Sequence, residues 1–173
     1  IVDLLPSPAD RPPARGQDGT ERPAANEAPL SAFVFKTVVD PHAGRITLFR
    51  VYSGVFKADG TVHNATRDVA ERVGALLLPQ GKQQQQVTEV RAGDLGAVAK
   101  LKETLTNDTL CDRAAPIVYP AVAFPEPATT FAIEPKTRGD EDKISTALQR
   151  LQEEDPVLRV SRDAQTHEML LSG

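Results

Sequence analysis

The chain has 173 residues, of which 40% are hydrophobic and 25% charged, an ordinary balance for one or two small globular domains. A formal net charge of −4 weighs against a dedicated nucleic-acid-binding protein, and a single cysteine excludes an internal disulfide and a cysteine-based zinc site. No apolar run reaches the length that spans a membrane, and the first residues lack the basic and apolar regions of a signal peptide.

Residues 1–29 are interpreted as a linker. Ile1 to Leu5 have the composition of a last helical turn that Pro6 ends. Six of the 14 prolines lie in this segment beside glycines and charged residues, so little apolar area offsets the entropy cost of ordering it. The chain has no initiator Met and opens within an apolar pattern, so we expect it to be part of a longer protein.

From Ser31 to about Phe124 the sequence predicts short strands separated by turns. Residues 32–39 form an apolar run, and the next five residues are typical of a turn. Residues 44–54 have strand composition, and a glycine at each end suits a tight turn or a bulge. After residues 55–57, the pair Asp59-Gly60 is a hairpin signal.

Three more strands are predicted at 69–78, 95–101 and 106–110, and the run Gln83 to Gln86 is interpreted as a solvated loop. Short strands at a spacing of roughly 8–12 residues, without a helical period, indicate a small closed β-barrel or a sandwich. We favour the barrel.

The strand at 44–54 carries two arginines and a tyrosine. Arg45, Arg50 and Tyr52 interleave with its apolar positions, so a face of the sheet is predicted to hold cations beside an aromatic ring. These arginines are interpreted either as solvated side chains of an amphipathic strand or as a face that meets an anionic partner such as RNA phosphate. The charge distribution allows the second interpretation, because residues 29–115 carry 11 Lys and Arg against 9 Asp and Glu.

The run Pro125-Glu126-Pro127 marks a domain boundary, after which the hydrophobic period changes. A strand is predicted at 128–134, and then a helix whose apolar face is formed by Ile144, Ala147, Leu148 and Leu151. Asp140, Glu141 and Asp142 stand at the start of that helix, where the helix dipole favours negative charge. Two strands follow at 157–161 and 168–171. The order β-α-β-β is that of a split β-α-β fold before its second helix and fourth strand.

No set of residues predicts catalysis. The sequence has no phosphate-binding loop, and His42, His63 and His167 stand in three different segments without a second ligand at metal-site spacing. Cys111 is interpreted as a buried structural thiol. The acidic residues are not paired as general acid–base catalysis requires, so we expect a non-catalytic chain of two modules.

Taken together, the motifs resemble bacterial elongation factor G. The sequence Gly-Arg-Ile-Thr-Leu-Phe-Arg-Val-Tyr-Ser-Gly at 44–54 is similar to the second domain of that family, and residues 1–8 resemble the end of its GTPase domain. Further stretches that are similar to the second domain lie at 29–36, 40–41, 64–66, 71–73, 90–95, 101–104, 108–111 and 124–127. Residues 132–137 and 151–156 resemble its third domain.

The resemblance implies a mainly β protein of three parts. Residues 1–29 would be the end of a GTPase domain and a Pro-rich linker. Residues 30–124 would be a six-stranded translation-factor β-barrel, and residues 125–173 a truncated α+β ferredoxin-like segment.

The resemblance also implies a function in protein synthesis. The parent protein would be cytoplasmic and would use GTP and Mg²⁺ to move tRNA and mRNA through the ribosome. Its partners would be small-subunit rRNA and ribosomal protein, and the barrel would pack on the GTPase domain, with no membrane involved. The family's nucleotide-binding residues do not lie in this chain, so the chain itself is expected to be a non-catalytic ribosome-binding part without cofactor or metal.

Arg45, Arg50 and Lys102 match basic positions of the family and are the candidates for contact with rRNA or with the GTPase domain. Two departures indicate a divergent paralogue. Asn107 stands where the family usually has glycine, although asparagine tolerates the left-handed backbone region. The glutamine run replaces a more charged loop. The alternatives are a ribosomal protection or release-type GTPase, and a barrel used for protein contact alone.

Overall fold

The computed structural model describes residues 4–40, 44–81, 83–135 and 137–173. The chain divides into two compact units, Ile1–Ala121 and Val122–Gly173. This division lies three residues before the boundary that the sequence predicts after Phe124. No helix among the described residues is long and apolar enough to cross a membrane.

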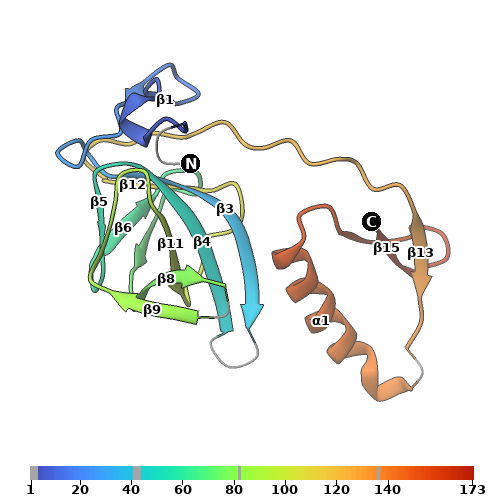
Figure 1. Ribbon diagram of the computed structural model, residues 1–173. Coiled ribbons are helices and arrows are strands. Elements are labelled where there is room, and N and C mark those ends of the chain that lie inside the picture. Colours follow the sequence, from blue (N-terminus) through green and yellow to red (C-terminus); the bar gives the residue numbers. More distant parts are fainter. Residues whose placement is uncertain (1–3, 41–43, 82, 136) are drawn as a thin grey trace. The chain divides into compact units, whose positions relative to one another are not determined.

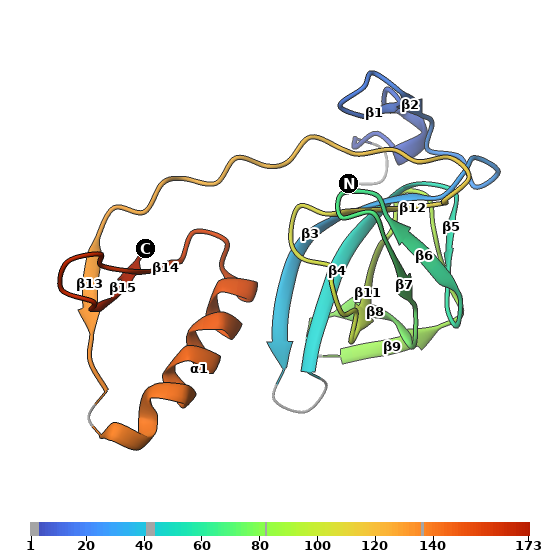
Figure 2. The same ribbon diagram turned by 180° about the vertical axis from the view of Figure 1, so that it is seen from behind.

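The first unit is built around an antiparallel sheet in the order β7-β6-β12-β3-β4-β11-β8-β9, which curls around its own apolar face (Figures 1 and 2). Strands β5 and β10 pair with each other in a separate, two-stranded antiparallel ladder. The mainly β class that the sequence predicts is confirmed. The strands are β3 (Ser31–Asp40), β4 (Gly44–Ser53), β5 (Val55–Lys57), β6 (Thr61–Asn64), β7 (Val69–Arg72), β8 (Leu76–Gln80), β9 (Gln83–Val87), β10 (Glu89–Arg91), β11 (Leu95–Ala99) and β12 (Thr109–Cys111).

The main core lies inside this sheet and consists mostly of aliphatic side chains. Phe49 and Phe56 stack within it with their ring centroids 4.4 Å apart. The alternation of a β-strand places Phe49 and Val51 of β4 in the core, whereas Arg50 between them faces outward. The core residues are Ala32, Val34, Phe49, Val51, Phe56, Val62, Val73, Leu76, Val90, Val98, Leu101 and Leu110.

The glutamine run forms a strand, so its interpretation as a solvated loop is wrong. Residues Gln83 to Val87 make up β9, which pairs in antiparallel register with β8 from Gln80↔Gln83 to Leu76↔Val87. The four glutamines are exposed, as expected, but the hairpin partner β8 provides a backbone ladder that composition does not reveal. Glutamine has no strong strand preference of its own, and here the pairing decides the conformation.

The N-terminal segment is more ordered than a linker. After the short 3₁₀ helix η1 (Pro8–Asp10), strands β1 (Ala14–Arg15) and β2 (Glu21–Arg22) form a hairpin. This hairpin is tied to residues 112–120, here called the strap, because the Gln17 N–H donates to the Val118 carbonyl at 2.8 Å and Arg22 donates to the Ala115 carbonyl at 3.1 Å.

The hairpin and the strap pack on the barrel near Phe33 of β3, Tyr52 of β4 and Cys111 of β12. Together with the barrel they enclose a second cluster that includes Phe33, Ile117 and Tyr119. The Tyr119 hydroxyl lies 2.7 Å from Ser31 Oγ, which lies 2.6 Å from Ser53 Oγ. The bonds of Gln17 and Arg22 to the strap join residues that are far apart in the sequence, so the local composition of residues 1–29 underestimates their order.

The second unit has the predicted order β-α-β-β. Its three strands form an antiparallel sheet in the order β13-β15-β14, and its one helix in the described residues follows β13 (Figure 1). The elements are β13 (Thr130–Ile133), the 3₁₀ turn η2 (Arg138–Asp140), α1 (Glu141–Glu154), β14 (Arg159–Arg162) and β15 (Met169–Ser172).

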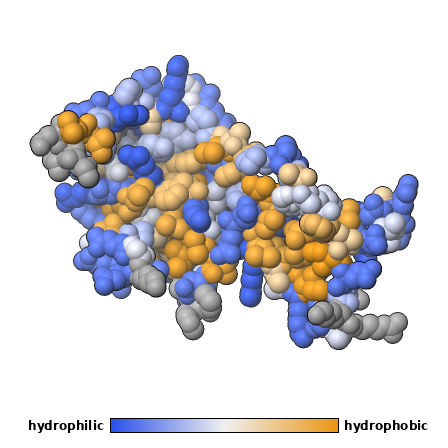
Figure 3. Space-filling view, turned by 45° about the vertical axis from the view of Figure 1, so that its right-hand side comes forward, coloured by the Kyte–Doolittle hydropathy of each residue, from blue (hydrophilic) through white to orange (hydrophobic). Residues whose placement is uncertain are grey.

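The helix buries less of its apolar face than the pattern suggests. Leu148 is buried, whereas Leu151 is 44% exposed and Phe131 of β13 is 69% exposed. Large apolar side chains are exposed in both units, and apolar patches are visible on the face drawn in Figure 3.

Candidate nucleic-acid interface

Arg45 lies on β4 and bonds to the backbone of the barrel. Its guanidinium donates to the Leu101 carbonyl, at 3.1 Å from Nε and 2.6 Å from Nη2, and also to the Lys102 carbonyl. In return, the Lys100 N–H donates to the Arg45 carbonyl at 2.8 Å. Arg45 therefore holds the chain that follows β11, and its side chain is half-buried.

Arg50 lies on the opposite face of the same strand. An odd separation of five residues directs the two arginine side chains to different faces, roughly 16 Å apart along the strand. The Arg50 guanidinium carbon lies 5.9 Å from the centre of the Tyr52 ring, and that ring packs against Tyr119 at 4.8 Å. The predicted pairing of a cation with an aromatic on one face is confirmed for Arg50 and does not include Arg45.

Lys102 is an exposed residue of a loop, residues 100–108, which a buried carboxylate holds in place. Glu71 of β7 is 3% exposed and accepts the backbone N–H groups of Lys102 (3.1 Å), Glu103 (2.7 Å) and Thr104 (2.8 Å). It also accepts the Thr104 hydroxyl at 2.9 Å. One side chain thus satisfies three successive donors of an irregular segment.

These contacts lower the pKa of the Glu71 carboxyl. Burial by itself raises the pKa of the Glu71 carboxyl, because it disfavours the charged form. The hydrogen bonds from Lys102, Glu103 and Thr104 act in the opposite direction and together outweigh burial, so the pKa lies below its ordinary value of 4.5. Glu71 is therefore a buried anion at neutral pH.

A second buried carboxylate holds the far end of the 100–108 loop. Asp108 Oδ2 accepts the Leu105 N–H at 2.9 Å, the Asn64 amide at 2.9 Å and Arg67 Nε at 2.6 Å. The Asn64 amide also donates to the Thr104 hydroxyl at 3.1 Å, which links the Asp108 and Glu71 contacts into one network. Such a network fixes a loop conformation because each member is costly to leave unpaired.

Asn107 adopts the left-handed backbone conformation, which asparagine tolerates. Its φ is 76°, and its N–H donates to the Val34 carbonyl at 2.8 Å. Lys100, at the start of the loop, also has a positive φ of 64°. The turn therefore survives the departure from glycine, and the loop keeps its place beside β3 and β4.

Lys102 shares a groove with two cations that the sequence analysis did not select. Arg72 at the end of β7, Lys100 and Lys102 are all exposed and line a depression of about 700 Å³, here called the Lys102 groove. Its floor is largely apolar and includes Ala70, Gly74, Ala75, Leu77 and Ala99. Glu71 also lines the groove but is buried, so the charged side chains exposed there are the three cations.

Arg72 and Lys100 could be found in part from the sequence. The spacing of Lys100 and Lys102 at i and i+2 would place both on one side of an extended segment. Arg72 lies near these two lysines only because β7 packs beside the 100–108 loop, and no local sequence pattern indicates that packing. Of the three predicted residues, the structure brings Arg45 and Lys102 together and leaves Arg50 apart. Their contact with RNA stays a prediction.

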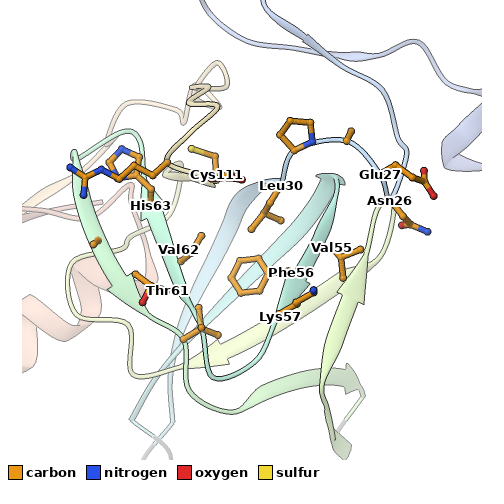
Figure 4. Close-up of a pocket in the computed structure, with 17 residues that line it drawn as sticks. Asn26, Glu27, Leu30, Val55, Phe56, Lys57, Thr61, Val62, His63 and Cys111 are labelled. Carbon is orange, nitrogen blue, oxygen red and sulfur yellow. The ribbon is translucent and has the colours of Figure 1, made fainter.

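A larger depression of about 840 Å³ lies between the loop before β3 and strands β5 and β6 (Figure 4). Phe56 lies at its centre, between Leu30, Val55 and Val62, as Figure 4 shows. Its polar rim mixes Lys57, His63 and Arg113 with Glu27 and Asp112. This rim therefore carries both signs of charge, whereas the exposed charges of the Lys102 groove are cationic.

The remaining candidates have structural surroundings. Cys111 is buried, and burial raises the pKa of its thiol, which agrees with the predicted structural role. His63 Nε2 lies 3.5 Å from Asp68, His167 is exposed in a turn, and His42 lies outside the described residues. The described residues contain no group of His, Cys, Asp and Glu that could hold a metal ion.

The acidic start of α1 also has local partners. Hydrogen bonds from Thr137 and Lys143 lower the pKa of Asp140, whose carboxylate lies 2.6 Å and 3.0 Å from their donor atoms. The side chains of Glu141 and Asp142 lie outside the described part of the structure. These contacts agree with a role in the fold near the helix start.

Both units match models of known protein families. The family model described as "Elongation factor G domain 2" matches residues 29–113, and the model described as "Elongation Factor G, domain III" matches residues 124–173. A crystal structure of a protein from Thermus thermophilus is similar over 100% of this chain, with 32% sequence identity and a TM-score of 0.79. This chain spans 24% of that protein.

Proposed function

The chain belongs to the elongation factor G family, of which it carries the second and third domains, and we propose that it is a non-catalytic, ribosome-binding part of a translational GTPase. In the parent protein, GTP binding with Mg²⁺ and GTP hydrolysis belong to a separate GTPase domain. The action of the whole is GTP-dependent translocation of tRNA and mRNA during protein synthesis in the cytoplasm.

The observation that carries this proposal is the Lys102 groove. It presents Arg72, Lys100 and Lys102 to solvent on a domain of a translation-factor family. Glu71, the one carboxylate that lines the groove, is buried and accepts backbone N–H groups of the loop, so three exposed cations stand against one buried anion although the chain carries a net charge of −4. Cations on a rigid loop suit contact with the phosphates of small-subunit rRNA.

Replacing Lys100 and Lys102 together with alanine is expected to weaken binding to the small ribosomal subunit. Each phosphate contact adds about one unit to the slope of log affinity against log salt, so the double variant should lose about 2 units of slope and about tenfold in affinity. Cosedimentation of the chain with purified small subunits over a series of salt concentrations measures both quantities.

Lys57→Ala is the matched control, because Lys57 is exposed on the same unit and lines the other depression. It should leave the affinity and the slope unchanged. A double variant with unchanged affinity and salt slope would remove the Lys102 groove as the contact. Binding that survives digestion of the rRNA would favour contact with ribosomal protein instead.

The two arginines on β4 are expected to respond differently to replacement. Arg50→Ala should leave stability nearly unchanged because the side chain is exposed, and it should lower the salt slope by about 1 if Arg50 meets RNA. Arg45→Ala removes donors to the Leu101 and Lys102 carbonyls and should lower the free energy of unfolding by about 1 to 2 kcal/mol. Denaturant titration and cosedimentation of each variant separate the effect on the fold from the effect on binding. An Arg45 variant of normal stability would contradict the structural assignment.

A further inference from the structure

The N-terminal hairpin and the strap stand on opposite sides of the barrel strands in the sequence, but they lie side by side in the fold (Figures 1 and 2). The bonds of Gln17 and Arg22 to the strap are joined by a third, in which the Gln17 side-chain amide donates to the Tyr119 carbonyl at 3.4 Å. The other described hydrogen bonds of residues 14–22 lie within the hairpin itself. The hairpin is thus bonded to the strap and to no barrel strand.

The middle of the strap is bonded to the hairpin, whereas its two ends are bonded to the barrel. At one end the Asp112 N–H donates to the Leu30 carbonyl at 3.1 Å, and at the other the Tyr119 N–H donates to the Thr109 hydroxyl at 3.0 Å. Within residues 113–118, the carbonyls that accept a described hydrogen bond accept it from the hairpin. No residue of the strap belongs to a described strand, so no backbone ladder holds it on the barrel.

Gly16 brings the hairpin into close contact with the strap. A Cβ at this position would lie 2.7 Å from Cγ1 of Ile117, closer than side-chain atoms pack. Ile117 is 2% exposed and belongs to the buried cluster that contains Phe33 and Tyr119. A methyl group at position 16 would therefore have to push the hairpin away from the strap or displace Ile117 from the cluster.

Cys111 is a probe of the strap that the chain itself provides. It is fully buried in the same cluster as Ile117, whose backbone is hydrogen-bonded to the Cys111 sulfur. It is also the last residue of β12, so the strap can leave the cluster while the ladder of β12 with β3 stays in place. Because the sequence has one cysteine, any thiol reaction of the chain reports this position alone.

We propose that the N-terminal hairpin is a latch that holds the strap on the barrel and thereby sets the length of the linker to the second unit. With the latch closed, the chain leaves the barrel at Pro120. With the latch open, residues 113–119 join the linker and add up to roughly 24 Å of extended chain. The open form is a minor state, because it exposes the buried side chains of Ile117 and Tyr119. The latch couples the segment before the barrel to the reach of the second unit, and it does not depend on ribosome binding.

The rate at which an excess of a small maleimide modifies Cys111 in the intact chain tests the proposal. Gly16→Ala should raise this rate by about tenfold or more, because the added methyl separates the hairpin from the strap. Arg22→Ala removes a donor to the strap and should raise the rate by about fivefold. The matched controls are Gly74→Ala, whose Cβ would have no atom within 4 Å, and Arg15→Ala, at an exposed position of the same hairpin. Both controls should react like the unchanged chain.

Two further measurements distinguish release of the strap from unfolding of the barrel. Release exposes little surface, so the rate should change little in urea below the unfolding transition that tyrosine fluorescence reports. Residues 103–135 contain one tryptic site, Arg113, and cleavage there should accelerate in the Gly16 variant together with the thiol reaction. A thiol rate with the full urea dependence of global unfolding overturns the proposal. So does a rate that neither Gly16→Ala nor Arg22→Ala raises above its control, and the Arg22 variant decides the question if the Gly16 variant does not fold.

Discussion

Replacing Glu71 with Gln is expected to lower the free energy of unfolding of the first unit by about 3 kcal/mol. The reason is that the neutral amide can accept from fewer of the Lys102, Glu103 and Thr104 backbone N–H groups, and its own N–H₂ group meets donors instead of acceptors. Buried donors without a partner cost more than the net value of an ordinary hydrogen bond. The same change should release the 100–108 loop and, with it, Lys102.

Unfolding of the first unit can be followed without interference from the second. The chain has two tyrosines and no tryptophan, and both tyrosines, Tyr52 and Tyr119, lie in the first unit. Tyrosine fluorescence during urea unfolding therefore reports this unit. Glu103→Gln is the matched control, because the Glu103 side chain is exposed on the same loop, and its effect should stay within about 0.5 kcal/mol. Equal stability of the two variants would show that Glu71 does not hold the loop.

The Glu71 variant should also change the dependence of stability on pH. The pKa of Glu71 is lower in the folded chain than its ordinary value of 4.5, so the unfolded state takes up a proton first as the pH falls. The contribution of Glu71 is complete above the unfolded pKa and is lost as the pH falls through the folded pKa. The stability difference between the unchanged chain and E71Q should therefore shrink below about pH 4.5. A difference that is constant with pH would contradict this assignment.

Gly54→Ala is expected to destabilise the first unit by about 3 kcal/mol or more. Gly54 has a φ of 72°, and a Cβ at this position would lie 2.7 Å from the backbone N and Cα of Leu30. Backbone atoms at that distance cannot move aside cheaply, because the Gly54 N–H also donates to the Ala25 carbonyl at 2.9 Å. The segment before β3 would have to leave its place on the barrel.

Gly44→Ala, at the other end of β4, separates the two causes. Gly44 has a similar φ of 76°, but no described atom lies within 4 Å of the position of its Cβ. It should cost about 1 kcal/mol, from the left-handed backbone alone. Tyrosine fluorescence in urea measures both variants. Equal losses at the two glycines would mean that close contact with Leu30 does not matter.

The sequence alone was sufficient where the signal is local. The strand at 44–54 and the helix that carries Leu148 both depend on neighbours within a few residues, and the structure has each of them. The order of motifs along the chain is that of the family, and both family models match in that order. Local pattern and linear order are properties that a sequence states directly.

Tertiary structure decided the conformation of segments whose hydrogen-bonding partners lie far away in the sequence. The glutamine run is a strand because β8 pairs with it, and the N-terminal hairpin is ordered because Gln17 and Arg22 bond to the strap. In the sequence, Glu71 cannot be told from a surface acid. The backbone N–H groups that it accepts belong to residues 102–104, which lie 31 or more positions away and come close only in the folded chain. Each of these depends on a hydrogen-bonding partner brought close by folding, and burial of such groups is favourable only when that partner is present.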